Sequence, residues 1–375
     1  MARDFVRSLP EHDRSLSAGW LRSINIDPIL LIFISLVIAF GLVILFSAVN
    51  QNEALFQAQL VRMGLAFLAL VVAAQLPPRL YVRWAPFVYL IGVGLLVMVL
   101  LMGVSVKGSQ RWLEIPGLTR FQPSEFMKIA VPLAVAWYFH DRPLPPSFKD
   151  VVVALGIVAV PAGLIVMQPD LGTGILVAGA GIAVVVLAGI RWRWMFGALA
   201  LVAAAAPGLW FTLQGYQRQR ILTLFNPESD PLGAGWNIIQ STTAIGSGGM
   251  WGKGLFQGTQ SHLDFLPEAQ TDFIIAVIGE ELGFVGIATL LALYVLLIGR
   301  GMFLATTAES TFGRLLSGAL LLTFFVYVFV NIAMVSGLLP VVGVPLPLVS
   351  YGGTSAITLM AGFGIVMSIR SHKAW

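Results

Sequence analysis

The sequence contains no cysteine, and only 11% of its 375 residues are charged. The absence of cysteine excludes disulfide bonds and thiol chemistry. Only four histidines are present and they are scattered, which argues against a histidine-based metal site. Soluble domains carry roughly 25% charged residues, so the low charge content argues against a soluble protein. With 58% hydrophobic residues, the composition is that of a polytopic membrane protein.

Long apolar runs divide the chain. A membrane-spanning helix needs ~20 apolar residues. Ten runs qualify: 28–49, 58–76, 84–104, 124–140, 150–168, 171–190, 195–213, 272–299, 312–336 and 350–370. The first run is too long for a signal peptide and no small-residue cleavage site follows it, so we expect a retained helix. We predict an all-α protein with about ten transmembrane helices in a single transmembrane domain. The predicted parts are the N-terminal segment 1–27, the domain 28–370 with a large loop at 214–271, and the tail 371–375.

The positive charges predict the orientation. Lys and Arg concentrate in short cytoplasmic loops, and placing both termini in the cytoplasm puts fourteen of the 22 positive residues on that side. Seven of the other eight lie in two places, residues 105–128 and the long loop with its approach; the eighth is Arg62. An anionic ligand on the outer side would explain these exceptions. Eleven of the 18 acidic residues also fall on the outer side.

The stretch 226–281 is polar and glycine-rich until it enters an apolar run at Thr271-Asp272-Phe273. It shows no helical pattern over about 45 residues, and loops of that length are usually functional or disordered. Apolar residues, among them Trp236, Ile238 and Trp251, favour a folded loop. Asp272 is the first candidate for chemistry, as a general base at the membrane interface. The alternative is structural, with Thr271 capping the next helix and Asp272 complementing its positive end.

Two further acids, Glu280 and Glu281, lie roughly 12 Å into the same predicted helix at 1.5 Å per residue. An ionisable group at such depth is costly unless it is paired or faces a cavity. An internal salt bridge is the structural interpretation, and Lys128 is the natural partner. Lys128 also lies three residues after Glu125, on the same helical face. It either extends to the interface or lines a polar cavity.

Four more cations on the outer side are candidates for phosphate binding: Arg111, Arg218, Arg220 and Lys253. Arg111 could equally bind lipid headgroups. Lys253 lies in a glycine-rich stretch, 246–254, without the spacing of a Walker motif, although such backbone can approach phosphates closely. Asp170, two residues before Gly172, is either a turn residue or a carboxylate in the same cavity.

A divalent cation, Mg²⁺ or Mn²⁺, is a further candidate, and the metal ligands stay unknown at this level. Asp264, Glu268 and Asp272 are spaced by four, but Pro267 disfavours a continuous helix through them. Residues 338–355 interrupt the helical pattern with proline and glycine. Irregular backbone at membrane depth is tolerated only where it is buried or lines a cavity, so we predict a re-entrant segment there. Two function classes remain open: an enzyme acting on a lipid phosphate, and a transporter of the same ligand.

Eight short runs resemble one family: FQPSE (121–125), QPDLGT (168–173), DPLGAG (230–235), AIGSGG (244–249), GKG (252–254), FLPE (265–268), TDF (271–273) and PLVSYGGTS (347–355). They are similar to motifs of the shape, elongation, division and sporulation family of peptidoglycan glycosyltransferases. The resemblance extends from about residue 28 to residue 370. The runs YQRQR (216–220) and NPESDPLGAG (226–235) are similar to the elongation branch rather than to the division branch.

This resemblance implies a ten-helix enzyme that polymerises lipid II at the outer face of the bacterial cytoplasmic (inner) membrane during cell elongation. It implies a class B penicillin-binding protein, a transpeptidase, as partner. It also implies that Asp272 is the catalytic residue and that Glu125, Lys128 and Asp170 belong to the site. Relatives often have histidine before the TDF run, whereas this chain has Gln270, so a proton relay through that position is not expected.

Lipid II carries an α-linked sugar on undecaprenyl pyrophosphate, and the glycan product is β-1,4 linked, so one inversion indicates direct displacement. A base must accept the proton of the attacking hydroxyl, and positive charge must stabilise the departing pyrophosphate. We assign Asp272 as the base and Lys128 to the pyrophosphate, with Arg111, Arg218, Arg220 and Lys253 as further candidates and a divalent ion as possible help. The alternative, a lipid II flippase, needs polar groups along a path to the inner face, and the inner halves of the predicted spans lack them.

Overall fold

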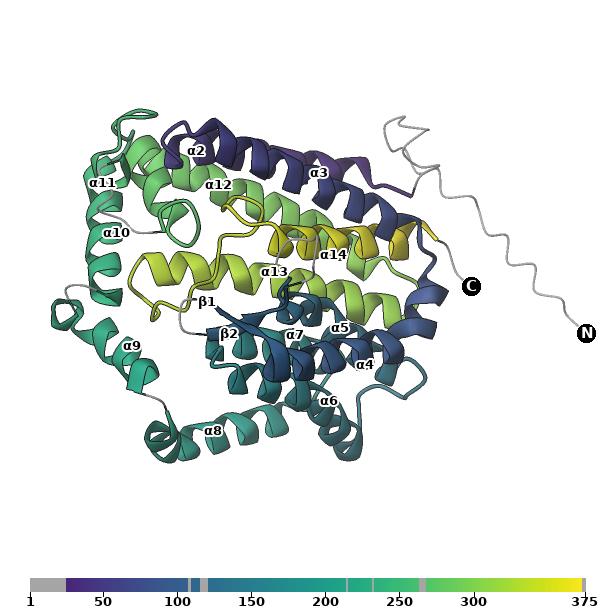
Figure 1. The fold of residues 1–375 in the computed structure, drawn as a ribbon. Coiled ribbons are helices and arrows are strands. Elements are labelled where there is room, and N and C mark those ends of the chain that lie inside the picture. Colours follow the sequence, from purple (N-terminus) through teal and green to yellow (C-terminus); the bar gives the residue numbers. More distant parts are fainter. Residues whose placement is uncertain are drawn as a thin grey trace, which may run out of the picture.

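The computed structural model describes residues 25–106, 109–114, 121–213, 215–230, 233–262 and 268–372. Ten long helices coincide with the ten predicted spans: α2 (Pro28–Ala48), α3 (Glu53–Gln75), α4 (Pro78–Met102), α5 (Pro123–Phe139), α6 (Phe148–Met167), α7 (Leu171–Leu187), α8 (Trp192–Thr212), α12 (Ile274–Thr306), α13 (Thr311–Val335) and α14 (Thr354–Ser371). Within the described residues, all of these except α5, α7 and α8 meet a length and hydropathy criterion for crossing a membrane. The chain is therefore a polytopic all-α membrane protein (Figure 1).

Several helices begin before the apolar run does, because a polar cap or a proline sets their first turn. Asn52 accepts a hydrogen bond from the Leu55 N–H at 3.1 Å, so α3 starts at Glu53 and not at residue 58. Pro78 occupies the first turn of α4, where its missing N–H costs nothing. Hydropathy located the middle of these helices, whereas capping chemistry fixes their ends.

Helix α13 lies at the centre of the bundle. One apolar core joins it to α2, α3, α12 and α14, and a second joins it to α4, α5, α6 and α7. Helix α8 lies at the edge of the bundle (Figure 1), and side chains such as Leu199 and Leu201 are exposed along it. A two-stranded hairpin of β1 (Val104–Val106) and β2 (Ser109–Trp112) connects α4 to the segment before α5.

The long segment after α8 is folded, as predicted, but the absence of a helical pattern was a wrong prediction. It contains α9 (Gly215–Phe225), the 3₁₀ turn η1 (Pro227–Ser229), α10 (Ala234–Gly248) and the short α11 (Thr259–His262). Helix α10 packs against α12. Of the predicted apolar anchors, Ile238 is buried, whereas Trp251 is 78% exposed.

Helix α12 is broken at Gly283, whose φ of 63° lies in the left-handed region. The stretch 249–254 fills the break. Gly249 and Met250 carbonyls accept from the N–H groups of residues 284 and 285 at 2.9 and 3.2 Å, and Gly254 N–H donates to the Glu281 carbonyl at 2.9 Å. A Cβ on Gly252 would stand 2.0 Å from that carbonyl oxygen. The glycine-rich stretch thus approaches the backbone of α12, which explains its glycines without a phosphate.

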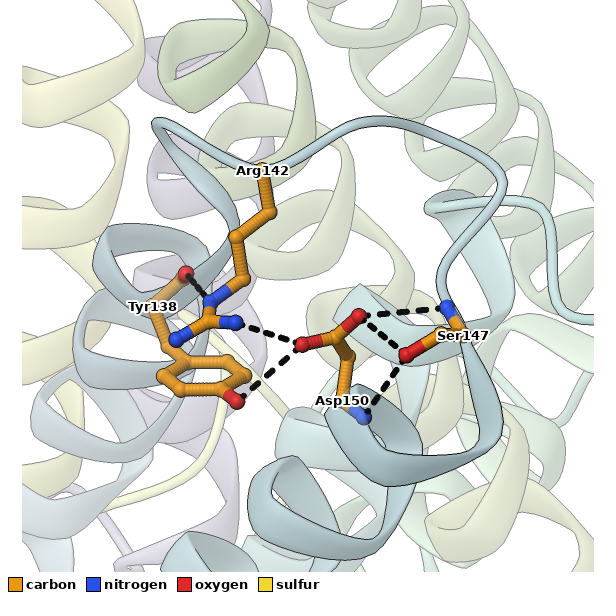
Figure 2. Close-up of polar contacts among 4 residues, drawn as sticks. All are labelled: Tyr138, Arg142, Ser147 and Asp150. Atoms are coloured by element: carbon orange, nitrogen blue, oxygen red, sulfur yellow. Dashed lines mark hydrogen bonds and ion pairs between the residues drawn. The ribbon is translucent and has the colours of Figure 1, made fainter.

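Two ion pairs lie at the end of the bundle at which α2 begins. Arg300 on α12 contacts Asp27 at 2.6 Å. Between α5 and α6, Arg142 Nη1 lies 2.6 Å from Asp150 Oδ1, and its guanidinium stacks on Tyr138 with 4.0 Å to the ring centroid (Figure 2). Ser147 and Asp150 form a capping box at the start of α6. The charges at this end are therefore used to join helices.

Candidate functional site

Asp272 lies just before the start of α12, at the end of the bundle opposite to the ion pairs of Arg300 and Arg142. Its side chain is half-buried. Helix α12 begins at Ile274 with Phe273 as N-cap and no side-chain cap, so the predicted capping by Thr271 is wrong. The Thr271 hydroxyl instead donates to the Glu268 carboxylate at 3.0 Å. This arrangement leaves Asp272 two residues before Ile274, the first residue of α12, where its negative charge is favourable.

The backbone around Asp272 is fixed by α13 and by the irregular segment 336–353. Asn331 Nδ2 donates to the Asp272 carbonyl at 2.8 Å and to the Val344 carbonyl at 2.6 Å. Ser350 donates to the Thr271 carbonyl, and the Tyr351 N–H donates to the Gln270 carbonyl at 2.8 Å. Residues 338–349 are thus non-helical, as predicted; residues 346–349 are buried beside the candidate base, whereas Leu338 is 73% exposed.

Glu125 and Lys128 form a buried ion pair in the first turns of α5. Lys128 Nζ lies 2.6 Å from Glu125 Oε1, and the two side chains are 4% and 9% exposed, respectively. The ammonium also lies over the ring of Tyr327 on α13, 4.2 Å from its centroid. The predicted shared helical face is confirmed, and burial shows that Lys128 does not extend to the interface.

Asp170 combines the two roles that the sequence left open. It is the N-cap of α7, accepting from the Thr173 N–H at 3.1 Å. The same carboxylate contacts Arg111 Nη1 at 3.3 Å, and Arg111 comes from β2 of the hairpin. The carboxylates of Asp170 and Glu125 both lie near enough to Tyr327 to act on its hydroxyl electrostatically. The structure therefore gathers these residues around Tyr327.

The distance from this cluster to Asp272 follows from α13. Tyr327 and Asn331 are four residues apart on that helix, which is about 6 Å of rise on one face. A second link is the irregular segment. A Cβ on Gly172 would touch Val342 at 3.2 Å, and one on Gly343 would touch Asp272 Oδ2 at 3.4 Å. Asp272 and the Lys128 cluster thus lie at the same end of the bundle.

Glu280 and Glu281 do not pair with Lys128, so that predicted partner is wrong. Glu280 Oε1 accepts from Lys253 Nζ at 2.7 Å and from the Thr259 and Gln260 N–H groups at 2.7 and 2.9 Å. Glu281 Oε1 accepts from the Ser47 hydroxyl of α2 at 2.6 Å. The predicted salt bridge inside the protein exists, but it anchors the long segment to α12 and occupies Lys253.

Arg218 and Arg220 lie on α9, which packs against η1 and α10. Arg218 donates to the Phe211 carbonyl at 2.6 Å. Arg111 pairs with Asp170 and Lys128 lies over Tyr327, whereas the arginines of α9 belong to a different part of the fold.

A metal site receives no support from the described residues. No group of three His, Asp or Glu side chains in that part of the chain is arranged to hold an ion. Of the three acids spaced by four, Asp264 falls outside the described residues. Glu268 and Asp272 alone do not make the ligand set of a typical Mg²⁺ or Mn²⁺ site.

Sequence reasoning missed Tyr327 and Asn331. Both are buried at 2% or less. The Tyr327 hydroxyl makes no hydrogen bond within the described residues, and the Lys128 ammonium lies over its ring. The available signal was their spacing: in the apolar run of α13 they are two polar side chains four residues apart.

Comparisons with known proteins agree with this arrangement. The model of the family described as "Cell cycle protein", of FtsW, RodA and SpoVE, matches residues 27–374. The chain belongs to the FtsW/RodA/SpoVE family. "Peptidoglycan glycosyltransferase MrdB" of Escherichia coli (strain K12) is 54% identical over 351 residues, which cover 93% of this chain and 95% of that protein. "Stage V sporulation protein E" of Bacillus subtilis (strain 168) is 34% identical and covers 93% of this chain and 98% of its own length.

Two solved structures share the fold of this FtsW/RodA/SpoVE family member. One, from work described as "Structural coordination of polymerization and crosslinking by a peptidoglycan synthase complex", superimposes with a TM-score of 0.81 at 31% identity, over 92% of this chain and 98% of that one. The other is the rod shape determining protein RodA of Thermus thermophilus, with a TM-score of 0.69 at 28% identity, over 91% and 95%. The resemblance seen in the sequence motifs is therefore confirmed.

Proposed function

We propose that this protein is a peptidoglycan glycosyltransferase of the elongation machinery that polymerises lipid II into β-1,4 glycan strands. The relatives named above support the reaction. The observation that carries the mechanism is the position of Asp272: a half-buried carboxylate at a helix entrance, its backbone held by Asn331. A buried ammonium, that of Lys128, lies beside Tyr327, which is one turn before Asn331 on α13.

The proposed reaction is a single displacement. The Asp272 carboxylate accepts the proton of the acceptor 4-hydroxyl while that oxygen attacks the anomeric carbon of the donor sugar. The bond from this carbon to the pyrophosphate oxygen breaks, which inverts the configuration. Lys128, with Arg111, stabilises the negative charge that develops on the pyrophosphate. No step is assigned to a metal ion, because the described carboxylates do not form a ligand set.

Glu125 and Asp170 are proposed to hold these cations in place. Glu125 forms an ion pair with Lys128 at 2.6 Å, and Asp170 forms one with Arg111 at 3.3 Å. Near Lys128, an apolar groove between α5, α13 and α14 is lined by residues such as Phe324, Leu359 and Phe363. Such a groove suits part of an isoprenoid chain.

The proposed location is the bacterial inner membrane, with both termini in the cytoplasm and the site on the outer side. The charge distribution supports this orientation, because Arg142 and Arg300 lie at the end opposite to Asp272. The proposed partner is a class B penicillin-binding protein, since one structural relative comes from a complex that couples polymerisation to crosslinking. The segment 214–271 is then the large periplasmic loop.

The test is polymerisation of purified lipid II by the purified chain, alone and with its partner, read as glycan ladders on a gel. We expect a ladder from the native chain and none from Asp272→Asn, with lipid II binding retained. Asp141→Asn is the matched control, since this carboxylate is 93% exposed at the opposite end. Equal ladders from the native chain and Asp272→Asn would remove Asp272 from the chemistry. No ladder from any form, with partner and Mg²⁺ present, would favour the flippase.

A further inference from the structure

Arg62 is an outer-side cation that the proposed mechanism does not use and that, unlike Lys253 and Arg218, is not engaged by a carboxylate or carbonyl among the described residues. It lies on α3, nine residues after Glu53, which is roughly 13 Å along the helix. Its side chain is half-buried and makes no hydrogen bond or ion pair with the described residues; its guanidinium lies over the Tyr351 ring, 4.5 Å from the centroid. An arginine at this depth is costly unless it serves a ligand or a partner.

The surroundings of Arg62 connect it directly to the candidate base. Tyr351, on which it stacks, donates its N–H to the Gln270 carbonyl at 2.8 Å, two residues before Asp272. One turn earlier on α3, buried Gln59 contacts the same segment through Ser350 and Gly352. A Cβ on Gly353 would stand 3.1 Å from the Arg62 side chain, so this glycine leaves room for it.

Arg62 and Lys128 lie on opposite sides of α14. The face with Gly362 lines the groove of Lys128. Gly364, two residues later and therefore turned by about 200°, lies against Leu70 of α3. Gly353 and Gly364 are eleven residues apart, about three turns, so the Arg62 contact falls on the α3 side. The backbone just before α12, next to Asp272, is hydrogen-bonded to the irregular segment 336–353. This segment lies between the Lys128 side and the Arg62 side of α14.

We propose that Arg62 binds the phosphate of the acceptor lipid, so that Asp272 lies between two cationic sites, one for each substrate. This inference rests on the proposed function. Joining two lipid-linked saccharides brings two anionic phosphates into the outer membrane layer, and Lys128 with Arg111 accounts only for the departing one. The Arg62 guanidinium has five donors in a planar fork that matches phosphate. Stacking on Tyr351 fixes the plane of that fork.

The experiment separates donor from acceptor. A lipid II analogue with a blocked 4-hydroxyl can act only as donor. Its coupling to labelled lipid II is measured with the full chain and its partner. The concentration of the blocked donor and that of the labelled acceptor are varied in turn. We expect Arg62→Gln to raise the apparent KM for the acceptor about 10- to 100-fold, as for one lost charge-assisted contact, with a much smaller change for the donor. Arg62→Lys should recover part of the loss. Arg83→Gln, an exposed arginine on α4, is the control and should match the native chain.

Three outcomes would overturn the proposal. One is an unchanged acceptor KM. The second is a fall in kcat alone together with a lower unfolding temperature, which would show that Arg62 only supports Tyr351. The third is a defect that depends on phosphatidylglycerol in the vesicles and not on acceptor concentration, which would show binding of ordinary lipid headgroups. Because the native chain and Arg83→Gln must be active for the comparison, failure of the proposed function is seen separately, as absence of coupling in all forms.

Discussion

The Glu125–Lys128 pair provides a test in which stability and catalysis respond differently. Replacing Lys128 by Met leaves the Glu125 carboxylate in a site where it is only 9% exposed. Within the described residues its other oxygen, Oε2, has no hydrogen-bond partner. The carboxylate then loses its ion-pair partner among the described residues. Breaking one partner of a buried ion pair typically costs about 3–5 kcal/mol, so we expect Lys128→Met to lower stability by about that amount.

The double variant Glu125→Gln with Lys128→Met removes both charges. Its stability should return to within about 1 kcal/mol of the native chain, because replacing a whole buried pair is often close to neutral. Polymerisation should stay absent in both variants, since neither has an ammonium beside Tyr327. Catalysis and stability therefore separate in the double variant.

Thermal unfolding of the purified chain in detergent measures the first effect, and glycan ladders from lipid II measure the second. Glu125→Gln alone is the third arm of the cycle and keeps the ammonium. Recovery of polymerisation in the double variant would refute the role of Lys128 in charge stabilisation. Native stability of Lys128→Met would refute the reading of the pair as buried and mutually dependent.

Two further predictions concern backbone that holds the site. Asn331→Leu removes the donor to the Asp272 and Val344 carbonyls. We expect the single-turnover polymerisation rate to fall more than tenfold, since each buried acceptor left unsatisfied costs about 1–3 kcal/mol. An unchanged rate would show that Asn331 does not position Asp272. Gly252→Ala places a Cβ 2.0 Å from the Glu281 carbonyl oxygen at a φ of 79° and should lower the unfolding temperature clearly. Gly246→Ala meets no atom within 4 Å and should be neutral or slightly stabilising inside α10; equal effects of the two would contradict the packing of this stretch on α12.

The transmembrane helices could be predicted because their signal is length and apolar content. The helix α10 could not, because its buried stripe has one large apolar side chain, Ile238, among the small residues Gly235, Ser241, Ala244 and Gly248. These residues recur at helical spacing, but small residues of this kind do not form an apolar face that hydropathy would reveal. They bring α10 close to α12, where a Cβ on Gly248 would stand 1.9 Å from the Gly279 carbonyl oxygen. The same sequence in isolation reads as a loop, so tertiary packing decides its structure.

Whether a side-chain contact in the site could be predicted depended on how far apart the two residues are in the sequence. Glu125 and Lys128 are three residues apart, and their pair could be predicted from helical geometry. The partners of Glu280 could not, because Lys253 reaches it only after residues 249–254 enter the break in α12 at Gly283. Asn331 is a similar case, since its contact with Asp272 joins residues 59 positions apart. Contacts of this kind depend on the fold and carry no local pattern.

The distribution of buried charge separates an enzyme from a flippase. Among the described residues, the fully or almost fully buried charged side chains Glu125, Lys128, Asp170, Glu280 and Glu281 all belong to the end with Asp272. At the other end, Asp27 and Asp150 are held at helix starts by arginines that are 23% and 43% exposed, respectively. Carrying a pyrophosphate across the bundle would require cations along the way, because an anion in the apolar interior is costly. The described interior offers them at one end only, so it can bind a lipid phosphate at that end but lacks the cations for a path across the bundle.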